Sequence, residues 1–231
     1  MKAVILCAGE GERLRPLTLT TPKPLLPIGG RPLVDHTIDW LRDHGVTELF
    51  INLHHLGERI ESHLGDGARF GVHITYSHET VIQGTAGGLR AFKHRLDGPF
   101  FVVYGDVLTH LDLDRLRADH ERTGGIGTLV AQRTGRPHDC DILEVDETRR
   151  ITALHRAPGS FAYGDLGSAA LYLLEPEILA FIPQGGAPDF VADVFSRALG
   201  AGKRLYAYES DEELLDIGTP ERYEDAQRRV P

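Results

Sequence analysis

The sequence predicts an α/β protein built on a mixed, mostly parallel sheet with helices on both faces. Three observations predict this class: strand-like and helix-like segments alternate over the first 125 residues, strand-like segments then follow one another after Gly125, and helical spacing returns near the C-terminus. Alternating strands and helices produce parallel sheets, whereas consecutive strands produce antiparallel hairpins. We expect one domain over residues 1–231, with halves at 1–125 and 126–231.

The alternation in the first half can be followed along the chain. Short apolar runs are expected as strands, and segments with apolar residues three or four apart as helices. The segment 32–43 has the clearest helical spacing, with Pro32 suited to a first turn and Gly45 to the stop. The expected strands are 3–8, 49–53, 72–76, 100–104 and 128–132. The expected helices are 32–43, 58–64, 86–96 and 113–122.

The second half has shorter apolar runs separated by turn residues. We expect antiparallel strands at 142–145, 151–154 and 169–174. We expect helices at 177–181, 192–199 and 220–229. In open α/β sheets ligands bind beyond the carboxyl ends of the strands, so functional residues are expected directly after strands. Asp112 and Asp114 are interpreted instead as helix-capping groups.

Composition excludes several classes of protein. Hydrophobic residues make up 41% and charged residues 26%, as in globular proteins. The formal net charge is −9 and no Lys/Arg run exceeds two residues, which argues against a nucleic-acid partner. Cys7 and Cys140 form no metal or disulfide pattern. No apolar run approaches the ~20 residues of a membrane span. We therefore expect a cytoplasmic protein without a membrane partner.

A glycine-rich loop follows the first strand. Gly9 and Gly11 allow the backbone to turn tightly and to bring N–H groups against an anion. The loop lacks the Gly-Lys-Ser/Thr of a P-loop. It also lacks the third glycine of a dinucleotide fingerprint, because Leu14 stands there and Pro16 soon follows. A nucleotide-dependent oxidoreductase is disfavoured on that ground.

Two cations near this loop narrow its meaning. Arg13 lies within it, and Lys23 stands between Pro22 and Pro24. The prolines are expected to hold this segment extended and stiff, so that Lys23 loses little freedom on binding. Cations on rigid loops beside a glycine nest indicate a site for a triphosphate. The histidines His54 and His55 follow a strand, but packing or surface roles are favoured for them.

The motifs together resemble those of the sugar-1-phosphate nucleotidylyltransferases. The family's usual signature is L-A-G-G-x-G-T-R-L-x-P-L-T followed by P-K-P. The matching segments here are LCAGEGERLRPLT at 6–18, PKPL at 22–25, GTAGG at 84–88, GD at 105–106 and DIGTP at 216–220. Glu10 and Glu12 depart from the signature, and Glu10 is expected to turn away from the triphosphate. The resemblance implies a Rossmann-like three-layer α/β/α fold of glycosyltransferase-A-like type, with a nucleotide-binding half before a sugar-binding half.

The resemblance also implies an enzyme and its site residues. Such enzymes join a nucleoside triphosphate to a sugar 1-phosphate and release pyrophosphate. Arg13 and Lys23 would be catalytic, and Asp106 and Asp216 would hold Mg²⁺. From the residues alone, a strand-end or capping carboxylate is the favoured interpretation of either aspartate. The implied nucleotide-binding residues are Leu6, Ala8, Gly9, Gly11, Gln83, Gly84, Thr85 and Gly88.

Base and sugar are less well specified. The GTAG segment resembles mannose-1-phosphate guanylyltransferases more than thymidylyl or uridylyl enzymes, which favours GTP with mannose or heptose 1-phosphate. Arg156, Asp165 and Ser168 are the candidate sugar-binding residues, although the surrounding motifs depart from the family's usual Glu-Lys-Pro and Asn-Ala-Gly. A UTP- or dTTP-dependent enzyme for glucose-type or muramic acid 1-phosphate is the alternative.

Two further expectations concern the whole protein. The resemblance is to short members of the family without a β-helix extension, among them heptose and muramic acid enzymes. A catalytically weak sugar-nucleotide-binding regulator is the competing class, and retention of both candidate cations and both aspartates favours the enzyme. The sequence leaves a homo-oligomer open.

Overall fold

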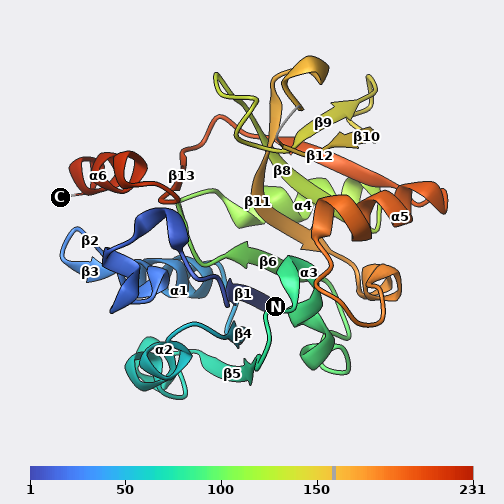
Figure 1. The fold of residues 1–231 in the computed structure, drawn as a ribbon. Helices are drawn as coiled ribbons and strands as arrows, with labels where there is room; N and C mark the ends of the chain where they lie inside the picture. Colours follow the sequence, from blue (N-terminus) through green and yellow to red (C-terminus); the bar gives the residue numbers. More distant parts are fainter. Residues whose placement is uncertain (158–159, 231) are drawn as a thin grey trace. The chain divides into compact units, whose positions relative to one another are not determined.

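The computed structural model describes residues 1–157 and 160–230, and it divides the chain into two compact units (Figure 1). The first unit comprises Met1–Ile82, Val103–Leu111 and Glu212–Pro231. The second comprises Gln83–Val102 and Asp112–Asp211. A division near residue 125 is expected from the sequence, whereas these units are made of interleaved segments.

The first unit is built around parallel strands. β1 (Lys2–Cys7) pairs with β4 (Glu48–Leu53), which pairs with β5 (His73–His78) (Figure 1). α1 (Leu33–Asp43) and α2 (Gly57–Leu64) form the connections between these strands. The predicted α/β class is therefore confirmed, with strand and helix bounds shifted by one or two residues.

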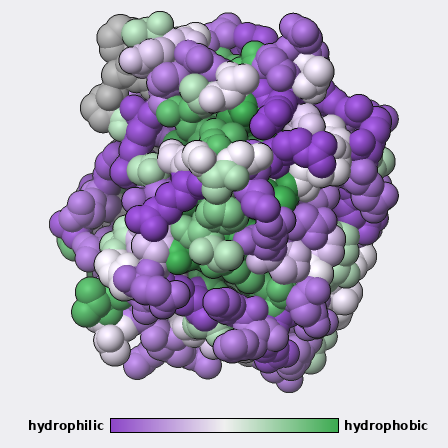
Figure 2. Space-filling model, turned by 90° about the vertical axis from the view of Figure 1, so that its right-hand side faces the viewer, coloured by the Kyte–Doolittle hydropathy of each residue, from purple (hydrophilic) through white to green (hydrophobic). Residues whose placement is uncertain are grey.

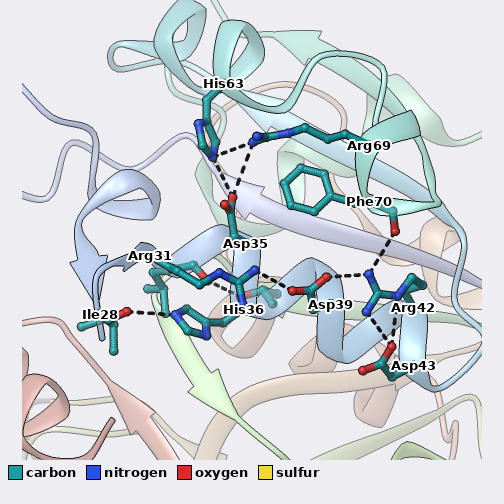
Figure 3. A network of polar contacts seen from close by, with 12 residues as sticks. Ile28, Arg31, Asp35, His36, Asp39, Arg42, Asp43, His63, Arg69 and Phe70 are labelled. Carbon is teal, nitrogen blue, oxygen red and sulfur yellow. Dashed lines mark hydrogen bonds and ion pairs between the residues drawn. The ribbon is translucent and has the colours of Figure 1, made fainter. Parts of the chain in front are cut away.

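Helix α1 is fixed on one side by burial and on the other by a polar network. Trp40 is buried and donates through Nε1 to the carbonyl oxygen of Leu111 at 2.9 Å. Figure 3 shows the polar side, where Asp35 accepts from His63 of α2 at 2.7 Å. In the same view Arg42 bridges Asp39 and the carbonyl oxygen of Phe70; the contacts anchor α1 to α2 and to the turn at Ala68–Phe70.

Distant short segments complete the first unit. The short strand β7 (Val107–Thr109) pairs antiparallel with β13 (Leu214–Asp216), and α6 (Pro220–Arg229) follows. A small hairpin joins β2 (Pro27–Ile28) to β3 (Arg31–Pro32). One buried cluster draws these pieces together; it consists of Leu14, Leu26, Ile28, Leu33, Leu108, Ile217 and Ala226. Hydrophobic burial at these positions therefore brings together loops that are up to about two hundred residues apart in the chain.

The second unit contains the antiparallel strands expected after Gly125. Its strands are β8 (Gly127–Arg133), β9 (Ile142–Val145), β10 (Ile151–His155), β11 (Leu166–Leu174) and β12 (Leu205–Glu209). β11 pairs antiparallel with β8 and β9, and β9 with β10. β12 pairs parallel with β8, an addition the sequence does not predict. β6 (Phe100–Tyr104) crosses the boundary between the units.

A bulge interrupts β11 next to Ser168, one of the candidate sugar-binding residues. The register with β8 shifts between Ser168 and Tyr172. Ala170 lies inside this interval with φ of 54°, in the left-handed region that L-residues avoid. Bulges re-aim side chains and are common beside active sites.

The helices of the second unit differ most from expectation. α4 (Leu113–Thr123) is present, and Asp112 caps it by accepting from the N–H groups of Asp114 and Arg115, as predicted for Asp112. The helix expected at 86–96 is instead α3 (Gly84–Gly87) followed by a 3-10 turn, since its glycines weaken helical structure. The segment expected at 177–181 is also a 3-10 turn. The segment at 192–199 divides into a π-helical turn and α5 (Ser196–Gly200).

The second unit has an aromatic core beneath these strands. Tyr172 of β11 packs edge-on against Phe190 and Phe195, with ring centroids 5.3 and 5.1 Å away. All three rings are buried. This packing holds the segment around residues 188–195 against β11, which places Asp189 near the second-unit site described below.

The surface is mostly polar. Hydrophilic residues cover most of the face in Figure 2, and hydrophobic residues gather in smaller areas between them. Among the described residues the exposed large hydrophobic side chains are Met1, Leu17, Leu19, Val81, Ile82 and Tyr163. Within the same part of the chain, no helix combines the length and apolar character needed to cross a membrane.

Candidate active-site residues in the two units

A hydrogen bond between Thr18 and Gly11 closes the glycine loop. Gly11 has φ of 64°, and a Cβ atom there would lie 2.8 Å from Cγ2 of Thr18. Thr18 is buried and donates through Oγ1 to the carbonyl oxygen of Gly11 at 2.9 Å. At Gly9 a Cβ atom would meet nothing within 4 Å, and the residue is exposed. The loop therefore presents backbone next to open space directly after β1.

The two glutamates that depart from the family signature both contact one arginine. Glu10 accepts a hydrogen bond from Arg15 at 3.2 Å, and Glu12 pairs with the same guanidinium group at 3.3 Å. Each is well exposed, with 42% of the Glu10 side chain and 69% of the Glu12 side chain open to solvent. Arg15 thus offsets the negative charge that these residues add to the loop.

Lys23 lies in a rigid turn and contacts Asp106. The segment is not extended throughout: Pro22 is extended, but Lys23–Leu25 is a 3-10 turn, because the fixed φ of Pro24 fits that geometry as well. The ammonium group of Lys23 is paired with the carboxylate of Asp106, and the Lys23 side chain is only 12% exposed. A candidate phosphate-binding cation and a candidate metal ligand are thus in direct contact.

The candidate metal ligand Asp216 is the last residue of β13, and the other candidate, Asp106, directly precedes β7. Asp216 stands opposite Val107, and the N–H of Ile217 donates to the carbonyl oxygen of Asp106 at 3.1 Å. Arg222 from α6 pairs with Asp216 at 2.5 Å. The short strands thus bring together the backbones of two aspartates that are 110 residues apart in the sequence.

The donor set suits a metal that takes most of its ligands from substrate. Among residues 1–157 and 160–230, no three His, Cys, Asp or Glu side chains gather in a way that could hold a metal ion. Magnesium is often bound by one or two carboxylates, with phosphate oxygens and water completing the shell. A metal bound by Asp106 and Asp216 would therefore take its remaining ligands from phosphate oxygens and water.

Arg13 lies beside Gly218, two residues after Asp216. A Cβ atom at Gly218 would stand 2.7 Å from Nη2 of Arg13 and 2.6 Å from Oδ1 of Asp216. Only glycine leaves room for this approach. Arg13 is an exposed residue, and a guanidinium group can bind two oxygens of an anion.

The sequence does not predict a buried network of polar side chains next to the start of the glycine loop. Asn52 accepts from the N–H of Cys7 at 3.1 Å and donates to Glu79 at 2.8 Å. Asn52 and Glu79 are 2% and 5% exposed. These hydrogen bonds fix the carboxyl end of β1, where the glycine loop begins. The signal of this network in the sequence is weak, because Asn52 stands inside an apolar strand.

Cys7 itself is a packing residue. Burial, and secondarily the charge of Asp106, raises the pKa of its thiol far above the ordinary range. A Cβ atom at Gly105 would come within 2.7 Å of the Cys7 sulfur, and the N–H of Gly105 donates to the carbonyl oxygen of Leu6 at 2.9 Å. The neutral thiol therefore packs closely against the backbone of Gly105.

The two neighbouring histidines also make structural contacts. A ring nitrogen of His54 lies 2.7 Å from the carbonyl oxygen of Glu79, and one of His55 lies 2.8 Å from that of Thr18. Both contacts tie the loop after β4 to other backbone segments, in agreement with the packing roles favoured from the sequence.

In the second unit, the candidate base-binding loop is anchored to residues 188–190. Gly84 has φ of 73°, and a Cβ atom there would lie 2.5 Å from the carbonyl oxygen of Pro188. Thr85 donates through Oγ1 to Asp189 at 3.0 Å and accepts from the N–H of Phe190 at 3.0 Å. The Gln83 amide oxygen accepts from Arg90 at 3.3 Å. The side chain of Thr85 is therefore used within the protein, and its backbone is what it can offer a ligand.

The candidate sugar residues fall in two places. Arg156 lies 3.9 Å from the carboxylate of Asp189, and Ser168 has a buried hydroxyl with no hydrogen-bond partner among the described residues. Asp165 instead pairs with Arg133 at 2.6 Å and is 56% exposed.

The sequence does not single out two acidic residues near Arg156 and Ser168. Burial, and secondarily the charge of Asp189, raises the pKa of Asp141, while the N–H of Ala157 and the guanidinium of Arg156 act in the opposite direction. Asp141 and Asp189 are therefore close enough to influence each other and Arg156.

The chain is similar in sequence to curated nucleotidyltransferases that act on sugar 1-phosphates. The chain is 35% identical to a UTP–glucose-1-phosphate uridylyltransferase of Synechocystis, over 100% of this chain and 63% of that protein. It is 33% identical to a mannose-1-phosphate guanyltransferase of Saccharomyces cerevisiae, over 96% of this chain and 63% of that protein. The chain thus spans less than two thirds of the length of these curated relatives.

Solved structures share the fold. A structure described as a putative glucose-1-phosphate thymidylyltransferase from Bacillus anthracis in complex with a sucrose superimposes with a TM-score of 0.90, covering 100% of this chain and 95% of that one, at 23% identity. The family model described as nucleotidyl transferase matches residues 2–231. The chain therefore belongs to the nucleotidyl transferase family.

Proposed function

We propose that the protein transfers a nucleotidyl group from a nucleoside triphosphate to a sugar 1-phosphate and releases pyrophosphate. The observation that carries the proposal is the pairing of Lys23 with Asp106. The backbone of Asp106 is hydrogen-bonded to Ile217, the residue after Asp216. All of these residues belong to the same unit as the glycine loop. Family membership and the names of the relatives support the same reaction.

The chemistry needs few protein groups. A non-bridging oxygen of the sugar 1-phosphate attacks the α-phosphorus, and a new P–O bond forms. The bond between the α-phosphorus and the oxygen bridging to the β-phosphorus breaks, and its electron pair leaves with pyrophosphate. Because the nucleophile is already anionic, no Ser, Cys or His nucleophile is required. Catalysis then depends on positioning two anions and stabilising charge on the phosphoryl oxygens.

Each residue of the first unit has a distinct role in this scheme. Lys23 supplies a compact charge for the transferring phosphoryl group, and Arg13 can clamp two oxygens at once. The glycine loop contributes backbone N–H groups. Mg²⁺, held by Asp106 and Asp216, would neutralise charge on the phosphate oxygens.

We further propose GTP as the nucleotide and mannose or heptose 1-phosphate as the acceptor. Support comes from the GTAG segment at 84–87 and from the mannose-1-phosphate guanyltransferases among the relatives. Gln83, Gly84, Thr85 and Gly88 remain candidates for the base. The cytoplasmic location expected from the sequence stays a prediction.

A uridylyl or thymidylyl enzyme for a glucose-type or muramic acid sugar is the second candidate. The Synechocystis uridylyltransferase is the observation in its favour. A regulatory protein without turnover is the third, and the exposed Arg13 and the Lys23–Asp106 pair argue against it.

The test is pyrophosphate release from a matrix of GTP, UTP, dTTP, ATP and CTP against neutral and acidic sugar 1-phosphates, with Mg²⁺ present. We expect turnover with GTP and a neutral hexose or heptose 1-phosphate. Preference for UTP or dTTP would select the second candidate. Sugar-nucleotide binding without release in any combination would leave the regulator.

A further inference from the structure

Asp141 and Ser168 stand directly opposite each other across two antiparallel strand ends of the second unit. Gly167 of β11 is paired with Ile142 of β9, and the N–H of Ser168 donates to the carbonyl oxygen of Asp141 at 2.8 Å. Directly opposed residues in an antiparallel pair project their side chains from the same face of the sheet. The carboxylate of Asp141 and the hydroxyl of Ser168 therefore share one face.

Both side chains retain hydrogen-bonding capacity. Oδ1 of Asp141 accepts from the N–H of Ala157 at 2.9 Å, and among the described residues no donor reaches Oδ2. Oγ of Ser168 is buried and, within the same part of the chain, lacks a partner. A buried polar atom without a partner is costly, so a ligand that satisfies it gains binding energy.

The neighbours of Asp141 link it to the candidate base-binding loop. Asp189 and Arg156 both influence the ionisation of Asp141, and Arg156 lies 3.9 Å from Asp189. Asp189 in turn accepts from Thr85 at 3.0 Å. We call these five residues the Asp141 cluster: Thr85, Asp141, Arg156, Ser168 and Asp189.

The charge of this cluster discriminates between classes of sugar. It holds two carboxylates against one guanidinium group, so its net charge is negative. Hydroxyl groups of a neutral sugar would donate to the free oxygen of Asp141 and exchange hydrogen bonds with Ser168. A carboxylate on the sugar would meet the net negative charge of the two aspartates.

We propose that Asp141, together with Ser168, is a specificity-determining residue that accepts hydrogen bonds from hydroxyl groups of the sugar and selects neutral, polyhydroxylated sugar 1-phosphates over acidic ones. The proposal rests on the proposed function and narrows its acceptor. It disfavours muramic acid 1-phosphate, which carries a carboxylate, among the alternatives considered above.

The test is Asp141→Asn in the full chain, with pyrophosphate release measured for the best neutral sugar 1-phosphate, its monodeoxy analogues and an acidic sugar 1-phosphate. We expect kcat/KM for the neutral sugar to fall by about 10-fold or more, the usual effect of losing a charge-assisted hydrogen bond to substrate. For the analogue that lacks the contacted hydroxyl, wild type and variant should differ by less than about 3-fold. The ratio of acidic to neutral sugar turnover should rise.

Asp139→Asn is the matched control, because it removes the same charge from an exposed side chain two residues away. It should match wild type with every sugar. Triphosphate binding without sugar, measured by calorimetry, should be unchanged in both variants, and melting temperatures should show both folded.

The outcomes separate the two proposals. If wild type turns over a sugar 1-phosphate but Asp141→Asn loses nothing, or loses equally with every deoxy analogue, the role of Asp141 is contradicted while the function stands. A wild-type preference for the acidic sugar would also contradict it. If wild type releases no pyrophosphate with any sugar, the proposed function fails first and the inference with it.

Discussion

Lys23 donates to the carboxylate of Asp106, although 83 residues separate them in the chain. The buried cluster explains the meeting. Leu26 follows Lys23 closely, Leu108 follows Asp106, and both are members of the cluster. Burial of these leucines positions the charged side chains beside them.

Lys23→Ala should lower kcat by at least about 100-fold, because a positioned cation at the transferring phosphoryl group is lost. Steady-state pyrophosphate release measures this. Lys203→Ala is the control, since Lys203 makes a surface pair with Glu177. Near-normal turnover of the Lys23 variant would remove this lysine from the mechanism.

Asp106→Asn should shift the Mg²⁺ titration of activity to about 10-fold higher metal or more, because ligand mutations weaken metal sites strongly. Activity is measured against Mg²⁺ at saturating substrates. Asp112→Asn, which changes a helix cap, serves as the control. An unchanged half-saturating Mg²⁺ concentration in the Asp106 variant would count against metal ligation.

Asn52→Leu should destabilise the protein by about 2 kcal/mol or more, because the buried N–H of Cys7 and the carboxylate of Glu79 both lose a partner. The melting temperature measures the loss. If Asn52 also positions the glycine loop, KM for the triphosphate should rise more than KM for the sugar. Equal stability of variant and wild type would show that the polar network is dispensable.

Ala170→Gly should stabilise the protein by up to about 1 kcal/mol, since glycine adopts the left-handed conformation of the bulge without the cost that alanine bears. Ala169→Gly, at a neighbouring residue without positive φ, should destabilise it. Thermal unfolding of both variants decides, and a lower melting temperature for Ala170→Gly would contradict the strain.

The stability difference between Asp141→Asn and wild type should depend on pH. Burial and Asp189 raise the pKa of Asp141 in the folded protein, so its favourable contribution is present below the unfolded pKa and is lost as pH rises through the folded value. The variant stays neutral. Its melting temperature should therefore rise relative to wild type as the pH increases above the ordinary aspartate pKa of about 4. A constant difference would contradict the direction of the shift.

Local patterns predict most of the fold. The apolar strands β6 and β9 and the helix α6 have the bounds expected from the sequence, because their periodicity and flanking turns are clear. The sequence does not predict β7 and β13, since strands of three residues that pair across about a hundred positions leave no local pattern.

The candidate site divides in the same way. Arg13, Lys23 and Asp106 lie in motifs that sequence reasoning can find. Asp141 could not be found, because only its register opposite Ser168 places it on the same face. Such a relationship depends on tertiary pairing, and the residue types alone do not specify it.

The most direct test of the proposed function follows the phosphorus atoms. GTP labelled at the α- or the γ-phosphorus is incubated with Mg²⁺ and the sugar 1-phosphate that supports the fastest pyrophosphate release. The α-label should appear in a sugar nucleotide and the γ-label in pyrophosphate. Transfer of the γ-label to the sugar, or no labelled sugar nucleotide with any triphosphate tested in the same way, would contradict nucleotidyl transfer.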